Sequence, residues 1–164
     1  MTKGITKLRA DDKLEFTIDE IEMGNFESEK SIEDYFYKNI NAFMETVFDE
    51  KVINAERQKY IVSGYIQISN TQILPKRGPR VDLYVECESG NNYLLEIKNP
   101  RSSGTEAIKA IGQIMYYSTL FPKANKLAIV SSVYDEGFMQ VIKKFDLDID
   151  FVLIGKGKTY LLKR

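Results

Sequence analysis

Apolar side chains recur at every third or fourth position between Ser31 and Phe48, which is the repeat of an α-helix with one buried face. This stripe consists of Ile32, Phe36, Ile40, Phe43 and Val47. At about 100° per residue it spans about 80° of the helix circumference, and Glu33 lies about 20° beyond its edge. We therefore expect a helix over Ser31–Phe48 that holds Glu33 at the margin of the core.

Short runs rich in β-branched and aromatic residues predict strands over Glu56–Ser63 and Tyr65–Ser69. The next segment, Asn70–Arg80, contains two prolines, a glycine and three cations, a composition that predicts a basic loop. Two further apolar runs, Val81–Cys87 and Tyr93–Lys98, are separated by a short polar segment. This arrangement predicts a β-hairpin.

The rest of the chain contains segments with the helical repeat of about 3.6 residues and segments with the two-residue repeat of a strand. Alternation over Lys13–Ile21 predicts a strand with one buried face. Two helices and three strands are expected downstream: Gly104–Phe121 and Glu136–Phe145 as helices, and Lys126–Val133, Asp150–Gly155 and Thr159–Lys163 as strands. This order predicts a single mixed α/β domain, with a strand-like extension at residues 1–27, a core at 28–155 and a terminal strand at 156–164.

Composition narrows the chemistry that this domain can perform. The chain has 164 residues, with 23 Lys and Arg, 24 Asp and Glu, and no histidine. The missing histidine excludes Ser-His-Asp and Cys-His nucleophile systems, histidine-ligated metal sites and an imidazole general base. Acid–base or metal chemistry must therefore come from carboxylates, lysine, tyrosine or the backbone.

Cysteine usage and hydropathy bear on the compartment. The single cysteine, Cys87, cannot form a disulfide within the chain, so a reducing cytoplasm and a small buried side chain at this position are expected. The longest apolar runs have four or five residues, whereas a membrane span needs about 20. The charged N-terminal sequence does not resemble a secretory signal. A net charge of −1 gives no global attraction to nucleic acid, so such binding would need local basic patches.

The predicted hairpin brings charged residues together. If its turn is centred on Ser89, Asp82 lies directly opposite Glu96, and Arg80 opposite Lys98. Side chains two positions apart share a face, so both carboxylates and both cations would lie on one face of the hairpin. The other face is expected to be apolar and to carry Val81, Leu83, Val85, Leu95 and Ile97. A slip of one residue in register would destroy this arrangement.

Two carboxylates this close repel each other unless a positive charge lies between them. Mg²⁺ suits such a pair, because it takes one or two carboxylates and keeps water and substrate phosphate as other ligands. The carbonyl of Ile97 is a further candidate ligand. Such a metal polarises a phosphoryl oxygen and lowers the pKa of a bound water. Lys98 would orient that water or balance charge on the phosphate.

A less specific explanation is a solvated hairpin face with cross-strand ion pairs. The pattern of an acid, any residue and a lysine occurs three times, at Asp11–Lys13, Asp49–Lys51 and Glu96–Lys98, and alone it means little. Only the third copy lies inside an apolar strand with an aspartate placed to face it. This context favours the metal site.

With these residues the chain resembles the PD-(D/E)XK nuclease superfamily, including NucS-type mismatch endonuclease domains, Holliday-junction resolvases and RecB-like nucleases. The matching residues are Arg80-Val81-Asp82-Leu83, then Glu96-Ile97-Lys98, then Gln113 with Tyr117 one turn later. The resemblance covers roughly residues 28–155 and implies a restriction-endonuclease-like fold, a central mixed sheet flanked by helices. It also implies hydrolysis of DNA phosphodiester bonds that depends on Mg²⁺ or Mn²⁺.

Carried over residue by residue, the resemblance makes Asp82 and Glu96 metal ligands and Lys98 the catalytic lysine. Glu33 would be the helical acid that completes the metal shell, with Glu29 as a rival one turn earlier. Alternatively, Glu33 is only an acid favoured by the helix dipole. Gln113 and Tyr117 match residues of the family's second helix that contact DNA, or else form an ordinary surface pair.

Local cations are the expected contacts to DNA phosphates. They are Lys76, Arg77, Arg80, Arg101 and Lys109, which cluster near the proposed site in sequence order. An ordinary basic loop is the alternative.

The leading functional hypothesis is a Mg²⁺- or Mn²⁺-dependent endodeoxyribonuclease. The alternative is a catalytically inactive module of the same fold that binds nucleic acid or a partner protein. A homodimer is compatible with the resemblance, because many nucleases with this core pair to cut both strands.

Overall fold

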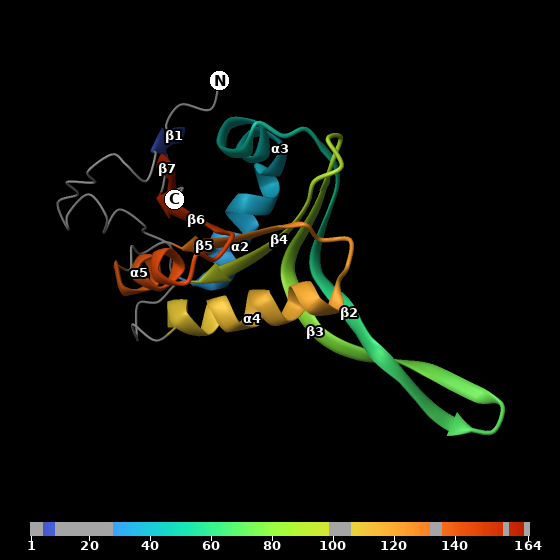
Figure 1. Cartoon of the computed structure of the whole chain (residues 1–164). Coiled ribbons are helices and arrows are strands. Elements are labelled where there is room, and N and C mark those ends of the chain that lie inside the picture. Colours follow the sequence, from blue (N-terminus) through green and yellow to red (C-terminus); the bar gives the residue numbers. More distant parts are fainter. Residues whose placement is uncertain (1–4, 9–27, 99–105, 132–135, 156–157, 163–164) are drawn as a thin grey trace.

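The computed structural model describes residues 5–8, 28–98, 106–131, 136–155 and 158–162. A seven-stranded sheet forms its centre, in the order β1-β7-β6-β5-β4-β3-β2 (Figure 1). The strands are β1 Ile5–Leu8, β2 Val52–Ser69, β3 Gln72–Cys87, β4 Asn92–Lys98, β5 Lys126–Ser131, β6 Ile149–Gly155 and β7 Lys158–Leu162. The helices are α2 Glu29–Lys38, α3 Ile40–Phe43, a π-helical turn Met44–Phe48, α4 Glu106–Leu120 and α5 Glu136–Lys144.

The sheet is mixed. Strands β4, β5 and β6 run parallel to one another, and β1 runs parallel to β7. The β2–β3, β3–β4 and β6–β7 pairs are antiparallel. A mixed sheet of this kind needs helices on its faces to bury the parallel strands. The predicted mixed α/β domain with a helix-flanked sheet is confirmed.

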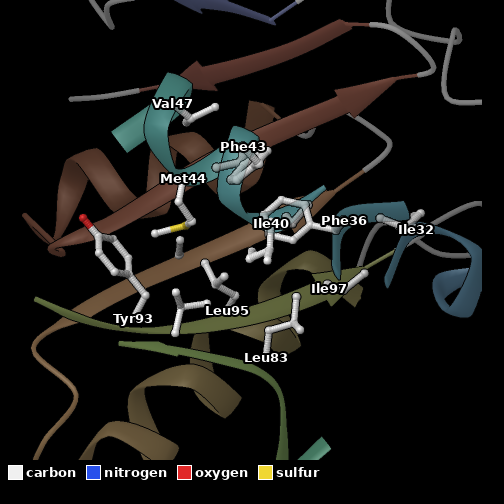
Figure 2. Packing of buried hydrophobic residues seen from close by; sticks show 14 of the residues in the cluster. Ile32, Phe36, Ile40, Phe43, Met44, Val47, Leu83, Tyr93, Leu95 and Ile97 are labelled. Carbon is white, nitrogen blue, oxygen red and sulfur yellow. The ribbon is translucent and has the colours of Figure 1, made fainter. Parts of the chain in front are cut away.

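Two apolar clusters, one on each face, hold the layers together. On one face the helices α2 and α3 and the π-helical turn pack onto Leu83, Leu95 and Ile97 (Figure 2). On the other face α4 and α5 pack onto Tyr84, Leu94 and neighbouring strand residues. Alternate residues of β3 and β4 therefore enter different clusters, as the period-two geometry of a strand requires.

The helix expected over Ser31–Phe48 forms, but in three pieces. Ser28 caps α2 through a reciprocal pair of hydrogen bonds with Ser31. The backbone leaves α-helical geometry at Asn39, whose side chain donates a hydrogen bond to the carbonyl of Tyr35. The chain then continues as α3 and the π-helical turn. Every residue of the predicted apolar stripe is buried, and Glu33 lies at the core margin as expected.

The predicted hairpin and its register are confirmed. The β3–β4 pairs run from Leu83–Leu95 to Glu86–Asn92, which is the register of a turn centred on Ser89. One residue departs from the predicted faces: Val81 packs with the α4 cluster, not with Leu83. Alongside it, β2 adopts a left-handed conformation at Gln58 (φ 48°), which interrupts the regular alternation of faces.

The predicted basic loop Asn70–Arg80 is wrong. Only Asn70 and Thr71 form a turn, and β3 begins at Gln72 and runs through the two prolines. Proline lacks a donor and is confined to edges and irregular positions of sheets. Here the β2–β3 pairing contains several register shifts, including one next to Val62, opposite Arg77. These irregularities and the free edge of this ribbon accommodate the prolines.

The downstream elements agree with the sequence to within a few residues at their ends. Strand β1 was not predicted, and it pairs with β7 at the sheet edge. The strand expected at Lys13–Ile21 lies outside the described residues. Cys87 is a free, buried thiol within an apolar cluster, as expected. None of the helices in the described ranges combines the length and hydropathy needed to cross a membrane.

Candidate active site

The candidate site lies where β3 and β4 separate. Their ladder ends at the pair Leu83–Leu95. Beyond it the carboxylate of Asp82 takes the place of a backbone acceptor: its Oδ2 accepts a hydrogen bond of 2.8 Å from the Ile97 amide. The strand register thus brings Asp82 beside the segment that carries Glu96 and Lys98, as the hairpin pattern predicted.

Glu96 and Lys98 form a buried ion pair. The Lys98 Nζ lies 3.0 Å from Glu96 Oε1, and Lys98 and Glu96 are only 8% and 3% exposed, respectively. The second oxygen of Glu96, Oε2, is buried and has no hydrogen-bond partner among the described residues. Buried carboxylate oxygens normally have partners, so an unpartnered one indicates a missing ligand or stored electrostatic strain.

Burial and like charge dominate the electrostatics of this pair. Burial raises the pKa of Glu96 to about 7, with a further rise from the charge of Asp82, although Lys98 opposes both. Burial likewise raises the pKa of Asp82. For Lys98, burial lowers the pKa, but the surrounding carboxylates outweigh it and the net shift is upward. The cluster therefore holds excess negative charge that a cation would relieve.

Helix α2 contributes a third carboxylate, Glu33, which two residues of β2 hold in place. The Arg57 Nε donates to Glu33 Oε1 at 2.8 Å, and Arg57 also pairs with Asp34. The Gln58 amide nitrogen donates to Glu33 Oε2 at 3.0 Å and to Asp82 Oδ1 at 3.2 Å. Gln58 thus bridges two carboxylates, and its left-handed backbone places it between them. Glu33 is brought to the site as predicted, but both of its oxygens already accept hydrogen bonds.

The rival acid, Glu29, also faces this cluster. Its charge contributes to the upward pKa shifts of both Glu96 and Lys98, although it is the smallest cause named for Glu96. Glu29 itself is exposed at the first turn of α2. The charge of Glu33 acts on the pKa of Asp82, whereas the charge of Glu29 acts on the pKa values of Glu96 and Lys98, so the two α2 acids influence different parts of the site.

Helix α4 closes the opposite face. Tyr117 is buried, and burial raises the pKa of its hydroxyl, with further effects from Glu96, Lys98 and Asp82. A hydrogen bond with Gln113 opposes that rise. The Gln113 Oε1 atom is itself buried and has no hydrogen-bond partner among the described residues. The predicted helical pair therefore borders the carboxylate cluster and is not an ordinary surface pair.

The predicted phosphate-binding cations do not all gather here. The guanidinium of Arg80 lies 5.4 Å from the ring centre of Tyr60, on the exposed side of the β2–β3 ribbon. The expected Arg80–Lys98 pair is absent from the described β3–β4 register, which ends before reaching them. Lys76 and Arg77 lie farther along β3. Arg101 lies outside the described residues.

Arg57 and Gln58 are site residues that the sequence pattern does not predict. Both lie in a strand whose apolar alternation is weak, and their contacts to Glu33 and Asp82 join segments about 25 residues apart. The available signal was local: a cation and an amide are adjacent in a strand that precedes the acidic hairpin. That signal does not distinguish them from surface residues.

The donor set matches a hard divalent cation more closely than any other metal. It consists of carboxylate oxygens and a backbone carbonyl, which Mg²⁺ and Mn²⁺ prefer. Among the described residues no group of three or more acidic or thiol side chains is arranged to hold a metal alone. Mg²⁺ does not require one, because it is commonly held by one or two carboxylates with water and phosphate completing its shell. The unpartnered Glu96 Oε2 is the atom that fits this requirement.

No family model and no curated protein match the chain. Among solved structures the chain is similar to the crystal structure of a repair endonuclease from Pyrococcus abyssi, with a TM-score of 0.46 and 15% sequence identity. The similarity covers 79% of this chain and 48% of that one, so this chain spans about half the length of that protein.

Proposed function

We propose that this protein is a metal-dependent nuclease that hydrolyses DNA phosphodiester bonds. One observation carries the proposal: Glu96 is buried beside Asp82 and Lys98, keeps one oxygen without a partner among the described residues, and has a pKa raised to about 7. Strongly perturbed carboxylates with a specific charge partner are typical of functional sites. A purely structural ion pair would satisfy both carboxylate oxygens.

Asp82, Glu96 and the carbonyl of Ile97 would hold Mg²⁺ or Mn²⁺, with Glu33 as the acid from α2. In a strand the N–H and C=O of one residue point toward the same neighbour, so the Ile97 carbonyl faces the β3 side, where its amide meets Asp82. When bound, the cation supplies a Lewis acid for the phosphoryl oxygen and for the attacking water.

The other residues would orient the metal ligands and balance negative charge on the phosphate. Lys98 places an ammonium next to Glu96, where it can stabilise charge that develops on the phosphate during attack. Gln58 fixes the orientation of Asp82 from the β2 side. Tyr117 and Gln113 supply polar groups on the α4 side, within reach of the same cluster.

Cleavage of plasmid and branched DNA with Mg²⁺ or Mn²⁺ tests the proposal. We expect the double variant Asp82→Asn, Glu96→Gln to lose at least about a hundredfold in rate, because several kcal/mol of transition-state stabilisation come from such a centre and each 1.36 kcal/mol is tenfold. The matched control is Asp49→Asn, which alters the same acid-x-lysine pattern in an exposed turn. Equal rates for the double variant and wild type would reject the proposal.

A second candidate is a catalytically inactive module that binds nucleic acid or a partner protein. The observation that favours it is the internal satisfaction of two acids: both oxygens of Asp82 and both of Glu33 accept hydrogen bonds. Thermal unfolding with millimolar Mn²⁺ separates the candidates, because a ligand that binds only the native state raises stability. An unchanged midpoint together with DNA binding in EDTA and no cleavage would support the second candidate.

A further inference from the structure

The far half of the β2–β3 hairpin forms an arm, residues 60–80, that projects away from the helices and the other strands (Figure 1). Pairing between the two strands continues to Ser69–Gln72 at its tip, whereas β4 pairs with β3 only from Leu83 onward. At about 3.4 Å per residue, the ten residue-to-residue steps from Tyr60 to Asn70 reach about 34 Å. The arm is therefore a two-stranded ribbon whose edges pair with no further strand of the described part of the chain.

The tip of this arm exposes apolar side chains on both faces. Tyr65 is 74% exposed and Ile73 is 65% exposed. Ile66, Ile68 and Leu74 are also largely exposed, and Ile66 pairs directly with Leu74 across the ribbon. Isolated two-stranded ribbons are marginal in water. A soluble protein that retains one with an apolar tip has a use for that surface.

Charge along the chain is distributed very unevenly around this arm. The 25 residues from Arg57 to Val81 contain five cations and no acid. The cations are Arg57, Lys59, Lys76, Arg77 and Arg80. The other 139 residues, with 18 cations and 24 acids, carry a net charge of −6. The near-neutral total therefore conceals a positive ribbon attached to a negative body.

We propose that the arm is a duplex-binding element that lies in a groove of double-stranded nucleic acid. The three arm cations, Lys76, Arg77 and Arg80, would contact the phosphates, and the uncharged tip from Tyr65 to Leu74 would contact base edges and sugars. A two-stranded ribbon fits the major groove, which is about 12 Å wide. The reach of the arm, about 34 Å, is also that of one turn of the duplex.

The arm is covalently continuous with the candidate site. Arg57 and Gln58, at its foot, contact Glu33 and Asp82. A duplex held along the arm would therefore lead toward the carboxylate cluster, whose net negative charge cannot attract phosphate by itself. This inference rests on the proposed function, which makes nucleic acid the substrate. It adds that the protein prefers double-stranded to single-stranded nucleic acid.

A second copy of the chain is a less favourable occupant. A two-fold symmetric contact sets each residue against its own counterpart or near it. Pairing two arms in this way would bring together two ribbons that each carry three cations and no acid within residues 60–80. A polyanion is instead attracted to the same ribbon, and each phosphate that the ribbon neutralises releases a counterion, which favours binding.

Binding of a fluorescein-labelled 30-base-pair duplex and of its separate single strand, measured by anisotropy in EDTA, tests the inference without cleavage. The tip variant combines Ile66→Ser, Ile73→Ser and Leu74→Ser. The cation variant combines Lys76→Gln, Arg77→Gln and Arg80→Gln. The control is Ile53→Ser, which removes an exposed apolar side chain from β2 outside the arm.

We expect the tip variant to weaken duplex binding about tenfold while single-strand binding changes little. The cation variant should reduce the slope of log K against log salt by about 0.9 for each phosphate that it no longer neutralises, up to about 2.7. Duplex binding by both variants equal to that of Ile53→Ser would overturn the inference. So would a wild-type dimer, seen by sedimentation, that the tip variant dissociates while DNA binding is retained.

The two proposals fail separately. If the arm variants bind duplex normally but the Asp82, Glu96 double variant loses cleavage, the arm inference is wrong and the nuclease stands. If no variant or wild type cleaves DNA but the arm variants lose duplex binding, the arm inference stands as a property of a binding module.

Discussion

Glu50 and Glu96 are two buried glutamates in one small domain, 7% and 3% exposed, and their surroundings differ completely. Glu50 follows the π-helical turn and reaches the β3–β4 turn. Its Oε2 accepts a 2.6 Å hydrogen bond from the Ser89 hydroxyl, and its Oε1 accepts one from the Asn91 amide. The Tyr93 hydroxyl also hydrogen-bonds to it. Each oxygen of Glu50 is satisfied by a neutral donor.

Glu96 has the opposite kind of environment. One oxygen pairs with Lys98, the other has no partner in the described part of the chain, and Asp82 adds a second negative charge nearby. Glu50 ties the end of the π-helical turn to the β3–β4 turn. Glu96 lies where β3 and β4 separate, and only one of its two oxygens is paired within the described residues. Similar burial therefore leaves these two carboxylates in different electrostatic states, because the number and kind of their partners differ.

The largest expected effect is on the pH dependence of stability. The pKa of Glu96 is raised in the folded state, so its contribution is full below the ordinary value of about 4.5 and is lost as pH rises through about 7. At roughly 1.4 kcal/mol per pKa unit, the free energy of unfolding should fall by up to about 3 kcal/mol between pH 4.5 and 8. Glu96→Gln should flatten this slope, as measured by urea unfolding.

The absence of histidine makes that measurement clean, because no imidazole titrates in the same range. Glu50→Gln is the matched control for removal of a buried carboxylate. A slope that persists in Glu96→Gln would mean that the pKa of Glu96 is not the one that shifts.

The next effect is on stability at fixed pH. Glu50→Gln replaces the charged acceptor of two buried hydrogen bonds by a neutral amide, whose nitrogen can face the Ser89 hydroxyl and whose oxygen can face the Asn91 amide, so both hydrogen bonds are weakened. We expect a loss of about 2 kcal/mol in the free energy of unfolding. Rates of any DNA cleavage by the folded variant should stay within about twofold of wild type. A stable Glu50→Gln protein with impaired cleavage would erase the distinction between the two glutamates.

The smallest effect concerns Glu33, whose oxygens are both hydrogen-bonded, like those of Glu50, although it lies in the carboxylate cluster with Glu96. It is satisfied by Arg57 and Gln58, as Glu50 is by its partners, yet it shares Gln58 with Asp82. We expect Glu33→Gln to cost about 1 kcal/mol in stability, because an acceptor for the charged Arg57 is weakened. Glu29→Gln provides the matched exposed control. Titration of Mn²⁺ by thermal unfolding shows which of the two acids serves the cation: the serving acid's variant should need more Mn²⁺ for the same shift.

The sequence was most informative where two independent patterns coincide. The hairpin register follows from two apolar runs on either side of a short polar turn taken as symmetric about Ser89, so the proximity of Asp82 and Glu96 is predictable. Glu33 followed from the angular position of one residue on an amphipathic helix. Both inferences use local geometry that neighbouring packing does not alter.

The rest depends on contacts between distant segments. The arm was mistaken for a loop because two prolines and a glycine normally end strands, and only the irregular pairing with β2 keeps them in a ribbon. The bridge from Gln58 to Asp82 requires a left-handed residue inside a strand. The Glu50 cluster joins residues about forty positions apart. No periodicity in the chain encodes these features.

The hydrogen bond from the Ile97 amide to Asp82 gives the site a spectroscopic handle in the backbone. An amide at this place in a ladder would normally donate to a backbone carbonyl of the neighbouring strand, but the Ile97 amide donates to a titratable side chain. Its nitrogen and proton chemical shifts will therefore follow the ionisation of Asp82 and the arrival of any cation beside it. A single backbone resonance within the β-sheet thus reports the ionisation state of the candidate site in a protein with no imidazole to observe.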